Sequence, residues 1–293
     1  MIKPLVTVIT ITFNCIKYGR KETLIQSIES VQNQDYENFE HIIIDGASSD
    51  GTLELLQSYP HLKVFSEPDN GVYDAFNKGV KRANGKYIVF VNSDDYFSTN
   101  KAISLSVDAL EKENADYSYA TTYLLNEKNP KRSAMRVPKI WKSFSKMPFC
   151  HQSMFCKVDV LKEIGLFDVN NKITSDYEVY LRLLFGGYKA VEVDEHIVTF
   201  RIGGISDNME IFAKERCELF KKIYAPFYEL SDVQIHEIYE NSYFPIGLAF
   251  KLVKYLRFSD RIRFLYEEIR RFIFQVRTSK KHRLVRVFGH RFV

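Results

Sequence analysis

The sequence has little cysteine and none of the cysteine patterns that stabilise small folds or hold zinc. Its four cysteines are Cys15, Cys150, Cys156 and Cys217, and they form no CxxC pair and do not have the spacing of a zinc site. We therefore expect reduced thiols in a cytosolic protein, in place of a disulfide framework.

Long apolar runs are also absent. No uninterrupted apolar stretch approaches the ~18 residues that span a bilayer. The first residues, MIKPLVTVITITF, alternate Thr with aliphatic residues and lack the continuous apolar core of a secretory signal. We expect this segment to be a first strand, in a protein that works in the cytosol or on a membrane surface but does not cross it.

Two glycine-rich phosphate loops are missing. The sequence contains no GxxxxGK[ST] motif, and no GxGxxG follows its first predicted strand. These absences argue against P-loop nucleotidases and Rossmann dehydrogenases, because both hold phosphate on a glycine-rich backbone. A bound diphosphate is then expected to be held through a metal ion.

The sequence has the composition of an ordinary globular protein, but its charge is unevenly distributed along the chain. Of its 293 residues, 45% are hydrophobic and 27% are charged, which is enough to bury a sizeable core. The formal net charge is +4, but residues 246–293 hold 13 Lys and Arg against 3 Asp and Glu. An acidic body with a basic tail is expected.

Strand-like and helix-like segments alternate along the first part of the chain. Such alternation on short links predicts an α/β fold with a mostly parallel sheet flanked by helices. The expected strands are 5–13, 39–44, 62–66 and 86–92, and the expected helices are 22–34, 52–58, 72–83 and 100–113. Further on we expect strand-like pieces at 117–125 and 149–157, a helix at 174–185 capped by Thr174 or Ser175, one strand or a strand pair at 188–200, and helices after 208.

Carboxylates follow three of these strands. They are Asp45, Glu67, Asp69 and the adjacent pair Asp94-Asp95. In open α/β sheets ligands bind beyond the carboxyl ends of the strands, so one binding rim is expected there. Two adjacent carboxylates repel each other unless a cation neutralises them, and hard oxygen ligands suit Mg²⁺ or Mn²⁺.

Several ordered motifs resemble one enzyme family. The segments are VTVITITFN, IIIDGASSDGT, SEPDNGVYDAFNKGV, ANGKYIVFVNSDD and TSDYE, within residues 5–206. Together they resemble the family 2 glycosyltransferases, which have the GT-A fold. The match is most similar to the bacterial transferases that build colanic acid, O-antigen, capsule and other surface polysaccharides.

The resemblance implies a nucleotide site at the strand ends. Asp45 matches the residue that hydrogen-bonds the base, and Glu67 and Asp69 match the acidic pair beside the nucleotide. The segment that lines the base and ribose pocket is Thr12, Phe13 and Asn14.

The resemblance also implies roles for the paired carboxylates. Asp94 matches the acidic position near the ribose, and Asp95 matches the metal ligand. This sequence has Asn92 where many relatives begin the motif with Asp, so which of the two carboxylates touches the cation stays open.

Asp176 matches the catalytic base of the family. Inverting transfer needs one base to take a proton from the acceptor hydroxyl. A position at the start of a helix lowers the pKa of a carboxyl, so partial burial must offset that effect. The alternative role for Asp176 is a helix N-cap.

Two further groups match substrate-contacting positions in relatives. His151 and Gln152 fall where relatives contact the acceptor sugar, although a lone histidine is also a common core residue. A glycine loop falls where relatives close a flexible segment on the diphosphate, with an ordinary turn as the alternative: Arg201, Gly203, Gly204 and Ser206.

The basic tail predicts an amphipathic helix. Its apolar positions recur at helical spacing: Leu248, Leu252, Tyr255, Ile262, Tyr266, Ile269, Ile273 and Val276. We expect it to bind the inner-leaflet membrane surface, or else to dock on the catalytic domain with its charge solvated. No nucleic-acid partner is expected, because the tail contains no recognised binding module.

The predicted organisation is a GT-A domain over 1–207, with a nucleotide-binding half at about 1–98 and an acceptor half at about 99–207, followed by a helical basic extension over 208–293. The predicted activity is inverting, metal-dependent transfer from a nucleotide sugar, UDP-linked, to a polyprenyl-diphosphate-linked glycan at the inner face of the cytoplasmic membrane. The alternatives are a nucleotidyltransferase and a non-catalytic sugar-nucleotide-binding protein. The oligomeric state stays open, with a homodimer as one alternative.

Overall fold

A computed structural model describes residues 3–129, 134–204 and 208–271 of the chain. The chain divides into two compact units, Met1–Lys139 with Met147–Glu215, and Ile140–Lys146 with Arg216–Val293. The boundary predicted after residue 207 falls shortly before this division, because helix α7 (Met209–Tyr224) carries the first unit on to Glu215.

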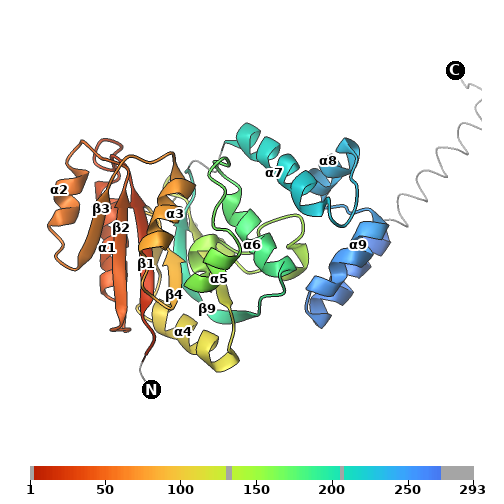
Figure 1. The fold of residues 1–293 in the computed structure, drawn as a ribbon, viewed down its shortest axis with the longest axis horizontal. Helices are drawn as coiled ribbons and strands as arrows, with labels where there is room; N and C mark the ends of the chain where they lie inside the picture. Colours follow the sequence, from red (N-terminus) through yellow and green to blue (C-terminus); the bar gives the residue numbers. More distant parts are fainter. Residues whose placement is uncertain (1–2, 130–133, 205–207, 272–293) are drawn as a thin grey trace, which may run out of the picture. The chain divides into compact units, whose positions relative to one another are not determined.

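The first unit is built on a mixed sheet. Its strands are β1 Val6–Thr12, β2 Phe39–Asp45, β3 Leu62–Ser66, β4 Tyr87–Phe90, β5 Tyr96–Phe97, β6 Tyr117–Leu125, β7 Ala134–Arg136, β8 Phe155–Lys157 and β9 Ala190–Arg201. In the described residues they form one sheet in the order β3-β2-β1-β4-β8-β6-β9-β5, with β7 paired to β6. Figure 1 labels the parallel strands β1 to β4 and the long strand β9.

The first four strands are parallel to one another, as the sequence predicts. They are runs of β-branched and aromatic residues, and most of their side chains are buried. Thr12 pairs with Asp45, and Asp45 pairs with Ser66, so three strands end at the same level. This register brings the loops that follow these strands together at one rim.

The second half of the sheet contains antiparallel pairs. Strand β8 runs antiparallel to both β4 and β6, whereas β6 and β9 are parallel. The expected strand at 149–157 is wrong in its first half, because His151–Ser153 form a 3₁₀ turn, η2, before β8 begins. The segment expected as one strand or a pair is the single strand β9.

Helices flank the sheet. In the first unit they are α1 Lys21–Gln32, α2 Thr52–Gln57, α3 Val72–Arg82, α4 Ala102–Glu113, α5 Val158–Glu163, α6 Ser175–Phe185 and the start of α7. Helix α3 packs on β1 and β2, and α4 packs on β6 and β9 (Figure 1). A Cβ on Gly79 would lie 2.9 Å from the Ile9 side chain, so glycine permits the close approach of α3 to β1.

The second unit is helical in its described part, as predicted for the chain after 208. It contains η1 Ile140–Lys142, the end of α7, α8 Asp232–Asn241, α9 Ile246–Leu252, η4 Val253–Tyr255 and a helix over 258–271. Its core joins Phe144 to Phe244 and Phe264, with ring centroids 6.3 and 5.2 Å from that of Phe144. Among the described residues, no helix combines the length and the apolar character needed to cross a membrane.

Candidate active site

Asp45 ties the ends of the first three strands together. Its carboxylate is fully buried and accepts hydrogen bonds from the hydroxyls of Thr12 (3.0 Å), Ser48 (2.5 Å) and Ser66 (2.7 Å). It also accepts from the Ser48 N–H at 2.9 Å. These four bonds match the capacity of a carboxylate. The geometry therefore gives Asp45 a local structural role, and its predicted bond to a base stays a prediction.

The predicted nucleotide residues divide into loop-building and exposed ones. Asn14 has a φ of +46° and its side-chain oxygen accepts from the Ser49 N–H at 2.9 Å, which fixes the loop after β2. The Phe13 ring, by contrast, is 53% exposed. A flat, exposed aromatic ring at the rim is a surface on which a base can stack.

Close packing places Asp69 beside this ring. A Cβ on Gly46 would lie 2.6 Å from Asp69 Oδ2 and 3.2 Å from Phe13, so a side chain at position 46 would displace both. Glu67 points elsewhere, because its carboxylate pairs with Arg82 at 2.7 Å. Of the predicted acidic pair, Asp69 is the one whose carboxylate approaches Gly46 on the same side as Phe13.

Asp95 is a fully buried carboxylate between two partners. Its Oδ1 accepts from the Arg201 backbone N–H at 2.9 Å, and its Oδ2 accepts from Gln152 Nε2 at 2.7 Å. Burial, and then the charge of Asp94, raise the pKa of Asp95 well above its usual range. A buried carboxylate beside a second one is a place where added positive charge is favourable.

The Asp94-Asp95 pair fits a hard divalent cation. Asp94 is partly exposed, whereas its neighbour Asp95 is fully buried. Among the described residues, no group of three or more His, Cys, Asp or Glu forms a metal cage. That arrangement suits Mg²⁺ or Mn²⁺, which take one or two protein carboxylates and complete their shell with water and phosphate oxygens.

Arg201 fixes the end of β9 against the carboxylate pair. Its guanidinium donates to the Asp94 carbonyl and to Gln26, pairs with Glu127 at 2.9 Å and lies over the Tyr96 ring at 5.2 Å. Its predicted bond to a diphosphate therefore requires these contacts to break, and stays a prediction.

The two glycines that follow Arg201 have open space beside them. Gly203 has a φ of +118°, and an added Cβ on Gly203 or Gly204 would meet nothing within 4 Å. Ser206 lies outside the described residues.

Asp176 lies in the first turn of α6 and is held on both oxygens. Its Oδ1 accepts from the Tyr73 hydroxyl (3.2 Å) and the Tyr177 N–H (2.8 Å), and its Oδ2 lies 3.2 Å from His151 Nδ1. The side chain is 20% exposed. Burial favours the neutral acid, but the bonds from these three partners outweigh it and lower the pKa of Asp176 below its usual value. Burial was expected to offset the lowering of the Asp176 pKa by the helix N-terminus, but the pKa stays below its usual value.

One short turn connects the two carboxylates of the site. In η2, His151 contacts Asp176, and its neighbour Gln152 contacts Asp95. The prediction that these two residues face an acceptor sugar remains untested. The hydrogen bonds give them a different task, because they fix the predicted base relative to the predicted metal ligand.

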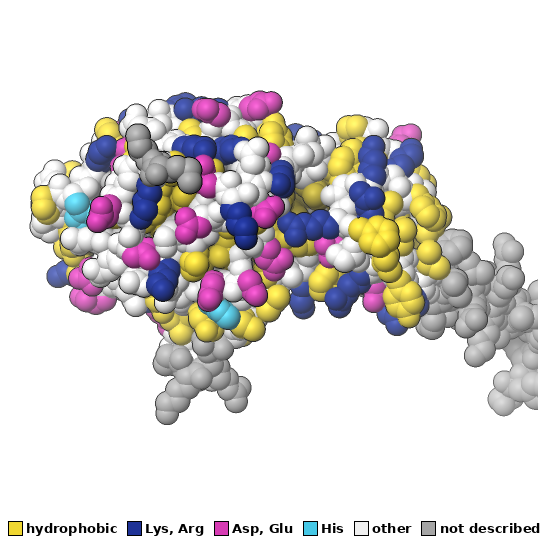
Figure 2. Space-filling view, turned by 90° about the horizontal axis from the view of Figure 1, so that it is seen from below, with side chains coloured by type: hydrophobic (Ala, Val, Ile, Leu, Met, Phe, Trp, Pro, Cys, Tyr) yellow, Lys and Arg dark blue, Asp and Glu magenta, His cyan; other side chains and the backbone are white. Residues whose placement is uncertain are grey.

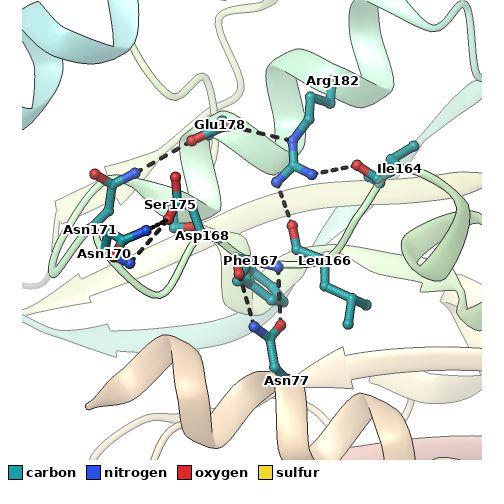
Figure 3. A network of polar contacts seen from close by, with 10 residues as sticks. All are labelled: Asn77, Ile164, Leu166, Phe167, Asp168, Asn170, Asn171, Ser175, Glu178 and Arg182. Atoms are coloured by element: carbon teal, nitrogen blue, oxygen red, sulfur yellow. Dashed lines mark hydrogen bonds and ion pairs between the residues drawn. The ribbon is translucent and has the colours of Figure 1, made fainter. Parts of the chain in front are cut away.

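A network of polar contacts holds α6 in place (Figure 3). The Asn77 side chain on α3 donates to the Phe167 carbonyl (2.8 Å) and accepts from the Phe167 N–H (3.0 Å). Arg182 on α6 donates to the carbonyls of Ile164 and Leu166. The Phe167 ring in turn stacks on Tyr73 with centroids 5.7 Å apart. The network therefore fixes the tyrosine that donates to Asp176.

Glu215 from α7 completes the support of α6. Its carboxylate accepts from the backbone N–H groups of Lys172, Ile173 and Thr174 at 2.7, 3.0 and 3.1 Å. Thr174 is the N-cap residue of α6, as one of the two predicted candidates, but its hydroxyl makes no capping bond to the first helical turn. The Thr174 hydroxyl donates to Glu215, and the Ser175 hydroxyl accepts from the Asp168 N–H.

The sequence alone did not predict the roles of Tyr73, Asn77 and Glu215. Tyr73 and Asn77 lie within the segment SEPDNGVYDAFNKGV, so the motif marked their helix but not their contacts. Glu215 carries no sequence signal, because its partners lie about 40 residues earlier in the chain.

Comparison with known proteins identifies the family. The family model "Glycosyl transferase family 2" matches residues 7–161. WfaP of Escherichia coli, named a UDP-Glc:alpha-D-GlcNAc-diphosphoundecaprenol beta-1,3-glucosyltransferase, is 28% identical over 70% of this chain and 80% of WfaP. TuaG of Bacillus subtilis, whose name places it in teichuronic acid biosynthesis, is 26% identical over 75% of this chain and 89% of TuaG.

Solved structures show the same fold. TarS 1–349 of S. aureus in complex with UDP-GlcNAc superposes with a TM-score of 0.63 and 17% identity, over 89% of this chain and 81% of TarS. The mannosyltransferase PcManGT of Pyrobaculum calidifontis, in complex with GDP-Man and Mn²⁺, gives a TM-score of 0.61 at 17% identity, over 91% of this chain and 75% of PcManGT. The predicted GT-A fold is confirmed.

The strand-end rim, the paired carboxylates and the helix that begins at Ser175 thus occur in a fold shared with sugar-nucleotide enzymes. The family model covers more than half of the chain and favours a transferase over the two alternatives. The protein therefore belongs to glycosyl transferase family 2 and is a glycosyltransferase that acts on a nucleotide sugar.

Proposed function

We propose that this enzyme transfers a sugar from a UDP-sugar, with inversion and with a divalent cation, to a polyprenyl-diphosphate-linked glycan. The observation that carries the proposal is the η2 turn, in which Gln152 binds Asp95 and His151 binds Asp176. One short turn thus contacts both Asp95, the proposed donor-side carboxylate, and Asp176, the proposed acceptor-side carboxylate.

The chemistry needs one proton acceptor and one site for the leaving group. The acceptor hydroxyl attacks the anomeric carbon, the bond from that carbon to the diphosphate oxygen breaks, and Asp176 takes the hydroxyl proton. The lowered pKa of Asp176 keeps it ionised at neutral pH, and Tyr73, whose pKa burial raises, remains a neutral donor to it. Asp94 and Asp95 would hold the cation, Mn²⁺ or Mg²⁺, which when bound would supply positive charge to the departing diphosphate.

The donor side is formed by the strand-end rim. The exposed Phe13 ring stacks on the base, Asp69 beside it binds the ribose, and Asp45, Thr12 and Asn14 hold the loops that shape this surface. UDP is the preferred nucleotide because WfaP is named for UDP-Glc and TarS binds UDP-GlcNAc.

The acceptor and the location follow from the relatives and from the charge of the tail. WfaP is named for an acceptor on diphosphoundecaprenol, a lipid that resides in a membrane. A basic extension fits the anionic inner leaflet of a bacterial cytoplasmic membrane. The enzyme therefore acts as a peripheral protein in surface polysaccharide synthesis.

The test is calorimetric titration of UDP-, GDP- and dTDP-sugars with and without Mn²⁺, followed by transfer assays with polyprenyl-diphosphate-linked glycans. We expect one UDP-sugar to bind only with the metal and to be transferred with inverted anomeric configuration. Binding of a GDP-sugar alone would overturn the choice of nucleotide. Failure of every donor to bind the folded protein would overturn the proposal as a whole.

A further inference from the structure

The last described helix, 258–271, has an unusual pattern of burial. Its inner face is Phe264 and Glu268, which are 3% and 2% exposed. The Phe264 ring packs on Phe144 and Phe244, with centroids 5.2 and 5.8 Å away, and Glu268 accepts from the Phe244 N–H at 2.9 Å. This face therefore has its partners within the second unit.

The opposite face of the same helix is apolar as well. Phe258, Ile262, Tyr266 and Ile269 are 76%, 58%, 64% and 41% exposed. At 100° per residue they fall within one stripe on the side away from Phe264. We call these four side chains the outer row. A helix that packs on a core by one face normally presents polar residues on the other, so the row points to a partner.

The apolar stripe predicted for the basic tail is buried in one part and exposed in another. Leu248 and Leu252, expected on the membrane side, are fully buried in the second unit, while Ile262, Tyr266 and Ile269 are exposed. Ile273 and Val276 lie outside the described residues.

The charge around the outer row is mainly positive. The exposed charged residues of segment 246–271 are Lys251, Lys254, Arg257, Arg261, Arg263 and Arg270, whereas its acidic residues are partly or fully buried. Figure 2 shows hydrophobic and basic side chains next to each other on the surface of this unit. The next residues, 272–293, add 6 Lys and Arg and no Asp or Glu.

We propose that the outer row and the basic residues around it form a docking surface for an anionic phospholipid bilayer. Aromatic and aliphatic side chains enter the boundary between head groups and acyl chains, and Lys and Arg contact the lipid phosphates. A second copy of this chain is a poorer occupant, because it would bring the same positive charge against this surface. The inference rests on the proposed function for its purpose, since a polyprenyl-linked acceptor lies in a membrane.

The test is cosedimentation of the full chain with vesicles of phosphatidylcholine alone or with 30% phosphatidylglycerol, without donor or acceptor. We expect the anionic vesicles to bind roughly ten-fold or more tightly, and added salt to weaken that binding. The triple variant Phe258→Ser/Ile262→Ser/Tyr266→Ser should lose roughly 100-fold or more in affinity. The control is Val233→Ser on α8, which removes an apolar side chain that is 73% exposed and outside the row.

Three results would overturn the inference. The first is unchanged vesicle binding by the triple variant, and the second is equal binding to neutral and anionic vesicles. The third is a wild-type protein that sediments as a dimer while the triple variant sediments as a monomer. Transfer to a detergent-solubilised acceptor separates this inference from the proposed function. The triple variant should retain that transfer, and a wild type that binds vesicles but transfers nothing would contradict only the proposed function.

Discussion

Gln152 is a neutral side chain that reaches a buried carboxylate. Its Nε2 donates to Asp95 Oδ2 at 2.7 Å, and both side chains are almost fully buried. A neutral donor stabilises the carboxylate without cancelling its charge. The bond from Gln152 lowers the pKa of Asp95 and so opposes burial, which raises that pKa, and a cation at the site would act in the same direction as Gln152.

Replacing Gln152 with Ala should weaken both the fold and the donor site. The change removes the only side-chain donor that Asp95 has among the described residues, at a cost of about 1–3 kcal/mol in the free energy of unfolding. Metal-dependent donor binding should weaken as well. Urea unfolding and donor titration measure the two effects. The control is Gln57→Ala, at the exposed end of α2, and equal losses in both variants would contradict the assignment.

Glu268 gives the second unit a stability that depends on pH. Burial raises the pKa of Glu268 to about 7, above the ~4.3 of an unfolded chain. The folded state therefore binds the proton more tightly, and the stability that this provides is complete below pH ~4.3 and is lost as the pH rises through 7.

The variant Glu268→Gln should be more stable than the wild type at pH 8, by roughly 1–3 kcal/mol, because glutamine resembles the protonated acid and retains an oxygen for the Phe244 N–H. The difference should vanish near pH 4.5. Urea midpoints across this pH range measure it, with Glu267→Gln on the partly exposed neighbour as the control. A less stable variant at pH 8 would contradict the sign of the effect.

The contacts of the candidate site residues could not be predicted from the sequence, and their functional roles stay predictions. Asp95 and Asp176 were found from motifs, and the structure joins each to one residue of a single turn. Arg201 was expected to face a phosphate, but it contacts protein acceptors. Motifs conserve residue type and order, whereas contacts depend on how distant segments meet.

At the scale of elements, α6 depends on segments far from it in the sequence. Asn77 on α3 holds the loop before α6, and Glu215 on α7 holds the backbone at its start. Because Asp176 is in the first turn of α6, these contacts set the position of the proposed base.

Removal of the Glu215 carboxylate should therefore affect both stability and transfer. In Glu215→Ala the backbone N–H groups of residues 172–174 lose a charged acceptor, which should cost about 1.5–3 kcal/mol in the free energy of unfolding. Turnover should fall more than donor affinity. Urea unfolding and steady-state kinetics test this, and Glu218→Ala on the exposed side of α7 should change neither. Normal turnover in Glu215→Ala would show that α6 keeps its place without it.

Strands and helices were predicted correctly where the hydrophobic pattern reflected burial in the sheet alone. Strands β1, β2 and β4 are mostly buried, β3 is partly exposed, and all four lie within about two residues of the expected ranges in the parallel part of the sheet. The segment FCHQSMFCK alternates like a strand, but His151 and Gln152 turn to reach two carboxylates, so only its end pairs with the sheet. The apolar residues of the tail share one helical spacing, but some of them are buried in the core of the second unit and others form the exposed outer row. Spacing alone could not separate these two groups.

At the scale of the molecule, the chain combines two kinds of unit. The first contains the family-matched residues 7–161, the paired carboxylates and α6. The second contains the helix with the outer row. The concentration of basic residues after position 246 lies within the second unit, but it does not mark the division, which falls at Glu215.

The central claim is that Asp95 serves donor binding and Asp176 serves proton transfer. The measurements are donor affinity with Mn²⁺ and turnover, made on the wild type, Asp95→Asn and Asp176→Asn. The control is Asp159→Asn, at an exposed residue in the first turn of α5. Asp95→Asn should lose metal-dependent binding. Asp176→Asn should keep it and lose roughly 10²–10⁴-fold in turnover. Wild-type turnover in Asp176→Asn, or unchanged metal-dependent binding in Asp95→Asn, would contradict the account.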